Sequence, residues 1–247
     1  MNDAWSNNYP QEPLAQEPLA QEPSTIRFLS PQIRSINRVA NIFDVCSAIS
    51  HNRGYIDHCY EMAESAKNLE YRICIVGHGR SGKDTAAAIL AEQLGYKING
   101  STSYGVIPLV TYALTGRTDI TAQNACYGER HNNRMYWYDF CNLLRRVDPL
   151  LLLKLTLAQT DMIVGTRSKE EFCNSLDYFK PLNVLWMERR GIPVDPTLEY
   201  DRAYVADECN KRGIRHTTIG NNDDVSTLEQ QLAWAIKSGL IARDTKC

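Results

Sequence analysis

The sequence has no apolar run long enough to cross a membrane. A membrane-spanning helix needs about 18 consecutive apolar residues, whereas polar or charged residues interrupt every apolar segment of these 247 residues. The polar N-terminal segment also lacks the apolar centre of a secretory signal peptide. We therefore expect a cytoplasmic protein without membrane association.

Motifs for zinc or disulfides are lacking as well, and neither sign of charge is in large excess. The eight cysteines show neither C-x-x-C spacing nor a nearby pair of histidines, and Cys74 and Cys141 lie in apolar surroundings. We expect reduced thiols in the core. The 27 Lys and Arg residues against 29 Asp and Glu residues leave a net charge of −2, which argues against broad nucleic-acid binding.

The first thirty positions contain a proline-rich repeat. Residues 11–23 read QEPLAQEPLAQEP, a five-residue period with a proline in each unit. This pattern prevents a regular helix and a packed core, so residues 1–30 are expected to form an extended tail, either featureless or a docking motif. Residues 31–69 instead carry apolar positions at helical spacing in two runs. They predict a helical N-terminal extension, and a homo-oligomer contact through it stays open.

What the chain does have is a strand, a glycine-rich turn, a lysine and a helix in direct succession. Residues 71–95 read YRICIVGHGRSGKDTAAAILAEQLG. The apolar run at 72–76 predicts a buried strand, and the alanine-rich run predicts a helix over 83–94 that ends at Gly95. This order is typical of a phosphate-binding loop, whose backbone N–H groups converge on phosphate oxygens. The sequence therefore predicts binding of a nucleoside triphosphate.

The loop positions have separate predicted roles. Glycines allow positive φ and a close approach of the backbone to a ligand, and Lys83 supplies charge for the β- and γ-phosphates. Asp84 stands where the usual motif has a hydroxyl, so we expect Mg²⁺ to be held by Asp84 and Thr85. The predicted ATP-binding residues are Gly77, Gly79, Arg80, Ser81, Gly82, Lys83, Asp84 and Thr85. The alternative is an ordinary glycine turn before an amphipathic helix.

Short apolar segments then alternate with helical ones, as in a doubly wound parallel sheet. Further strands are expected at 97–98, 162–164, 184–187 and 217–219. Helices are expected at 108–114, 132–146, 150–157 and 225–236. The pattern predicts an α/β kinase domain over residues 70–247.

Arginines occur at positions suited to phosphoryl transfer. Arg130 and Arg134 are four residues apart, so on one helix they would share a face and could grip a monophosphate. Arg167 directly follows one predicted strand, and Arg189 and Arg190 follow the next. Strand ends of this kind meet at the ligand-binding edge of the sheet. A surface salt bridge is the alternative for each arginine, and the placement of Arg167 favours function.

Polar and aromatic residues complete the candidate site. Ser101, Thr102 and Ser103 form a polar turn after the 97–98 segment, where an acceptor would bind. Trp137 has the helical spacing of a core residue rather than that of a base-stacking one. Asp139 is a weak candidate for orienting the acceptor.

Five segments together resemble bacteriophage deoxynucleoside monophosphate kinases and related phage P-loop kinases. They are GHGRSGKDTAA at 77–87, GSTS at 100–103, ERHNNRMYWYDF at 129–140, VGTRSKEEF at 164–172 and IGNN at 219–222. The resemblance implies a nucleoside monophosphate kinase-like fold, ATP and Mg²⁺ as donor and a deoxynucleoside monophosphate as acceptor. It also implies that Lys83 contacts the phosphates, and that Arg130, Arg134 and Arg167 face acceptor or transition-state charge. One departure is the segment 189–199, which is too short for the arginine-rich lid of adenylate kinases.

The sequence thus predicts a P-loop kinase that moves the γ-phosphoryl group of ATP to a small phosphorylated acceptor, with a (deoxy)nucleoside monophosphate favoured. Lys83, Arg134 and Arg167 are the predicted catalytic residues. The predicted acceptor-binding residues are Ser101, Thr102, Ser103, Arg130 and Arg134. Two alternatives stay open: a kinase of another small metabolite such as a coenzyme A precursor, and a non-catalytic NTP-binding regulatory or scaffold protein.

Overall fold

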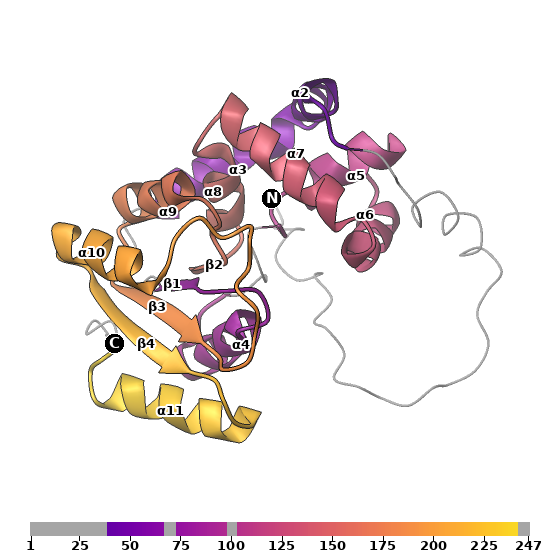
Figure 1. Ribbon diagram of the computed structural model, residues 1–247. Coiled ribbons are helices and arrows are strands. Elements are labelled where there is room, and N and C mark those ends of the chain that lie inside the picture. Colours follow the sequence, from indigo (N-terminus) through magenta and orange to yellow (C-terminus); the bar gives the residue numbers. More distant parts are fainter. Residues whose placement is uncertain (1–38, 67–72, 98–102, 242–247) are drawn as a thin grey trace.

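The computed structural model describes residues 39–66, 73–97 and 103–241 (Figure 1). Within these ranges one sheet is formed by four parallel strands, in the spatial order β2-β1-β3-β4. The strands are β1 (Ile73–Val76), β2 (Met162–Val164), β3 (Asn183–Glu188) and β4 (Arg215–Gly220). The α/β prediction is therefore confirmed at this level.

The predicted strands agree with the observed strands, with one exception. The predicted strands near 162–164, 184–187 and 217–219 lie within β2, β3 and β4. Lys97 is not in a strand, and Ile98 lies outside the described residues. Instead, the Lys97 main chain is tied to the start of β2, because its N–H donates to the Asp161 carboxylate at 2.7 Å and its carbonyl accepts from the Asp161 N–H at 3.0 Å.

Strand β1 occupies a central position because all four of its residues are buried and apolar. Ile75 pairs with Val164 of β2 on one side and with Leu185 of β3 on the other. Continuous apolar runs of this kind suit a parallel strand that is covered on both faces. The segment after Val76 therefore starts in the middle of the carboxyl edge of the sheet, where ligands of open α/β sheets bind.

Helices cover both faces of the sheet, so it is doubly wound (Figure 1). Helices α4 (Lys83–Leu94) and α11 (Val225–Lys237) pack on one face, where Leu90 and Leu232 meet Ile75 and Leu185. The opposite face is covered by α9 (Lys169–Asn174), the π-helical turn η3 (Ser175–Phe179) and α10 (Arg202–Arg212).

A second core joins the remaining helices into a layer beside the sheet (Figure 1). Its buried residues include Val45, Val110, Phe140 and Leu152, which come from four different helices. The helices of this layer are α2 (Ile42–His51), α3 (Arg53–Ala66), α5 (Ile107–Thr115), α6 (Ile120–Gly128), α7 (Arg134–Val147) and α8 (Leu151–Leu157). The N-terminal helices α2 and α3 thus pack against α5, α7 and α8, and they share one core with them.

The first described helix begins at a strong local signal. The Asn41 side chain accepts from the Asp44 N–H at 3.1 Å, and the Asp44 carboxylate accepts from the Asn41 N–H at 3.1 Å. This reciprocal capping box satisfies two N–H groups that a helix start leaves unpaired. The predicted tail at residues 1–30 lies outside the described residues. None of the described helices is both long and apolar enough to cross a membrane.

Candidate functional site

A tight glycine turn joins β1 to α4. Gly77 has φ 139° and Gly82 has φ 90°, values that disfavour any side chain. A Cβ at Gly77 would lie 2.4 Å from the Met187 carbonyl oxygen, and a Cβ at Gly82 would lie 2.1 Å from Asn221 Nδ2. Gly82 is also the N-cap of α4 and has no side chain to cap it. The first N–H groups and the positive end of the helix dipole therefore face this turn, which suits an anion.

Lys83, the first residue of α4, is folded back on this turn. Its ammonium group donates to the His78 carbonyl oxygen at 2.6 Å, and only 8% of the residue is exposed. Burial lowers its pKa to about 8, the Arg167 charge adds to this lowering, and Asp84 and Asp195 oppose it. Lys83 therefore carries a charge that its surroundings only partly compensate, and an added anion would be stabilised beside it.

Arg167 lies between β2 and α9, where hydrogen bonds position it. Ser168 caps α9 by accepting from the Glu171 N–H at 3.0 Å, and the buried Glu171 carboxylate in turn accepts from the Arg167 N–H at 2.7 Å. Gly165, with φ 83°, lies against the Lys83 stem, since a Cβ there would be 3.6 Å from Lys83 Cε. The structure therefore places Arg167 next to the glycine turn, as the strand-end argument predicts.

Asp195, which no sequence pattern points to, lies in the segment 189–200 between β3 and α10. Its Oδ2 accepts from the Gly79 N–H at 3.1 Å and from Arg167 Nη1 at 2.5 Å. Arg134 Nη2 lies 4.0 Å from the same oxygen. Burial alone would raise the pKa of this carboxyl, but hydrogen bonds from Thr197 and the Arg167 charge outweigh it and hold the pKa far below its usual value. Asp195 is therefore an ionised carboxylate in contact with the turn.

The end of β4 supports the turn from another side. Asn221 Nδ2 donates to the Ser81 carbonyl oxygen at 3.0 Å, and the Asn221 N–H donates to the Glu188 carbonyl oxygen at 2.8 Å. Asn222 accepts from the Arg190 N–H at 2.7 Å. Each of the four strands thus supplies a residue to the site at the same edge of the sheet.

Arg134 and Arg167 come together, whereas Arg130 does not share a helix face with Arg134. Arg130 lies in a separate 3-10 turn, η2 (Glu129–His131), and its guanidinium stacks over the Tyr127 ring at 3.9 Å. The helical run is interrupted because Asn133 Nδ2 donates to the Glu129 carbonyl oxygen at 3.1 Å, competing with main-chain bonding. The prediction of a single arginine face over 130–134 was therefore wrong.

The other predicted site residues have mixed placements. Asp84 and Thr85 are exposed in the first turn of α4, and Arg189 and Arg190 are exposed after β3. Ser103 is half-buried, whereas Ser101 and Thr102 lie outside the described residues. Trp137 is buried in the helical core, which confirms its predicted packing role.

Metal binding by the protein alone has little support in the described ranges, where no group of three or more His, Cys, Asp or Glu side chains could hold an ion. Mg²⁺ at nucleotide sites needs only one or two protein ligands beside phosphate oxygens and water. Asp84 and Thr85 are exposed, so their oxygens are accessible to an ion, and Mg²⁺ binding by them stays a prediction.

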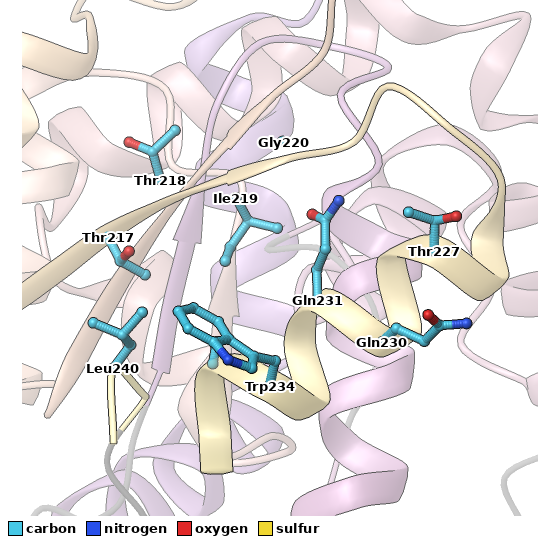
Figure 2. Close-up of a pocket in the computed structure, with 10 residues that line it drawn as sticks. Thr217, Thr218, Ile219, Gly220, Thr227, Gln230, Gln231, Trp234 and Leu240 are labelled. Carbon is cyan, nitrogen blue, oxygen red and sulfur yellow. The ribbon is translucent and has the colours of Figure 1, made fainter. Parts of the chain in front are cut away.

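A hollow among the described residues lies away from the glycine turn. A pocket of about 450 Å³ lies between β4 and α11, where Ile219, Gln231 and Trp234 line it (Figure 2). None of the turn residues 77–83 contributes to it. Because the chemistry of the glycine turn depends on main-chain N–H groups and charge rather than on an apolar cavity, we place the functional site at the turn.

Comparisons of the chain with protein-family models, with curated proteins and with solved structures find no match.

Proposed function

We propose that this chain is a P-loop kinase that transfers the γ-phosphoryl group of ATP to a small phosphorylated acceptor, with a (deoxy)nucleoside monophosphate as the favoured acceptor. The observation that carries the proposal is the meeting of Lys83, Arg167 and Arg134 around the glycine turn. An uncapped helix N-terminus with three cationic side chains is a donor set for a polyphosphate. The likeness of the loop sequence to phage deoxynucleoside monophosphate kinases adds support.

The mechanism follows from positioning and charge, since phosphoryl transfer asks little covalent chemistry of a protein. The N–H groups of the turn and Lys83 would hold the donor phosphates. Arg167 and Arg134 would neutralise charge that develops on the transferred group. Mg²⁺, held beside Asp84 and Thr85 when bound, would supply further charge neutralisation.

The acceptor would enter from the helical layer. Arg134 begins α7 and reaches the Asp195 carboxylate next to the turn, so the start of α7 faces the donor site. Arg130 and Ser103 lie in the same layer, before α7 and α5. These residues are suited to a phosphate-bearing acceptor because guanidinium and hydroxyl groups both donate to phosphate oxygens.

A panel assay tests the proposal. ADP release from ATP and Mg²⁺ should rise at least about tenfold over the acceptor-free rate when the correct nucleoside monophosphate is added. The panel should contain the common ribo- and deoxyribonucleoside monophosphates and a coenzyme A precursor. Stimulation by the precursor alone would redirect the proposal to a metabolite kinase. Tight ATP binding with no stimulation by any acceptor would favour the regulatory or scaffold alternative.

The pH dependence of nucleotide binding gives a second test. The Lys83 pKa of about 8 means that the free protein loses this charge as the pH rises through 8. Bound phosphates favour the protonated amine, so binding takes up a proton above that pH. The dissociation constant of an ATP analogue should be level below pH 8 and rise by up to about tenfold per pH unit above it. Calorimetry from about pH 7.5 to 9.5 measures this slope, and Lys83→Arg, which keeps its charge, should flatten it.

A further inference from the structure

We infer that Asp195 competes with the phosphates of a nucleotide, because it already occupies the donors that the phosphates would use. Binding would then require the segment 189–200 to release its carboxylate from the glycine turn. The inference rests on the proposed function in that it takes this turn to be the phosphate site. It goes beyond that function by assigning the chain a built-in control of nucleotide affinity.

Asp195 Oδ2 accepts hydrogen bonds from groups that would also donate to a phosphate oxygen. The Gly79 N–H and Arg167 Nη1 donate to it at 3.1 and 2.5 Å, and Arg134 Nη2 stands 4.0 Å away. The Asp195 side chain is only 7% exposed, so its carboxylate is largely shielded from water. A carboxylate and a phosphate carry the same sign of charge and accept from the same N–H groups. They cannot both take up the Gly79 N–H and the Arg167 guanidinium.

Hydrogen bonds within the segment 189–200 hold the Asp195 carboxylate in this position. The second oxygen, Oδ1, accepts from the Thr197 N–H at 3.0 Å and from the Thr197 hydroxyl at 2.7 Å. The Asp195 N–H donates to His78 Nδ1 at 3.2 Å. The carboxylate is thus held from its own segment and from the turn at once.

Gly79 provides the space for this contact. A Cβ at residue 79 would lie 2.7 Å from Asp195 Oδ2. Gly79 does not have the positive φ of Gly77 and Gly82, so its backbone does not itself call for glycine. The lack of a side chain at Gly79 is therefore explained by the approach of the carboxylate.

Two roles of Asp195, competition with phosphate and structural support of the turn, predict opposite changes in nucleotide affinity when its charge is removed. If Asp195 only holds Arg167 and the turn in place, removing its charge should weaken nucleotide binding. If it competes, the binding-competent fraction of the protein rises when the charge is removed, and the apparent affinity rises with that fraction. Asp195→Asn keeps the shape of the side chain and an oxygen for Thr197 while removing the charge.

The test is calorimetric titration of the full chain with a non-hydrolysable ATP analogue and, separately, with inorganic tripolyphosphate. We expect Asp195→Asn to lower both dissociation constants by about tenfold. Thr197→Val, which removes one hydrogen bond to the carboxylate, should lower them less. Asp201→Asn is the matched control, because it removes the same charge in the same part of the chain, where Asp201 caps α10, and asparagine caps equally well. It should leave both constants unchanged.

Equal or weaker binding by folded Asp195→Asn would overturn the inference, as would failure of every variant to bind tripolyphosphate. Should Asp195→Asn fail to fold, Thr197→Val decides the sign. The outcome is separable from that of the proposed function. Tighter tripolyphosphate binding by the variants would uphold the competition even if no acceptor stimulates ADP release, and an active kinase with unaltered affinities would sink the competition alone.

Discussion

Replacing Lys83 with alanine should reduce phosphoryl transfer by about a hundredfold or more. The Lys83 ammonium group contacts the glycine turn and lies close enough to Arg167 to feel its charge. In the proposed mechanism the transferred phosphoryl group would sit beside these two cations. No uncharged side chain at this position stabilises charge that develops in the transition state. Steady-state ADP release with the best acceptor measures the effect.

Folding should survive this change, and a second variant separates charge from packing. Lys83 is buried, and its lowered pKa shows that the folded state disfavours its charge, so loss of that charge should not lower the melting temperature. Lys83→Met keeps an aliphatic side chain against Gly165 and removes the ammonium group, with its charge and its hydrogen bond to the His78 carbonyl oxygen. It should be as inactive as Lys83→Ala. Near-normal turnover by either folded variant would contradict the P-loop kinase proposal.

Changing Arg167 to lysine should lower turnover by about a hundredfold, while the dissociation constant of an ATP analogue changes far less. Lysine keeps the charge but loses the planar fork that can donate two parallel hydrogen bonds to a phosphoryl group. An interaction that matters mainly in the transition state shows itself in turnover and not in ground-state binding. Steady-state kinetics measured beside calorimetric binding separate the two quantities.

Arg117→Lys is the matched control for Arg167→Lys. Arg117 also donates two hydrogen bonds to one carboxylate, that of Asp119, at 2.8 and 3.0 Å, but the pair is exposed and lies before α6. Exposed ion pairs contribute little, so this variant should match the parent chain in both measurements. Equal turnover in Arg167→Lys and the parent would make Arg167 structural and leave Arg134 as the candidate.

Local signals were sufficient for the parts of the fold that depend on few residues. Strand β1 and helix α4 could be predicted because a short buried apolar run, positive-φ glycines and an alanine-rich segment each favour one conformation. Helices α6, α9 and α10 were not predicted. The last two are short or highly polar, and they are stabilised by capping at Ser168 and Asp201 and by packing on the sheet.

The candidate site also has features that local sequence predicts and features that depend on the tertiary structure. The glycine turn, the lysine after it and the placement of Arg167 after a strand can be predicted from sequence, because they follow from residues adjacent in the chain. Which charged side chains meet depends on the packing of distant elements. Arg134, Arg167 and Asp195 are far apart in sequence, and they converge because the carboxyl ends of parallel strands lie at one edge of the sheet and α7 packs beside it. No local pattern around Asp195 could reveal that its carboxylate reaches the Gly79 N–H, since that contact depends on the path of the whole segment between β3 and α10.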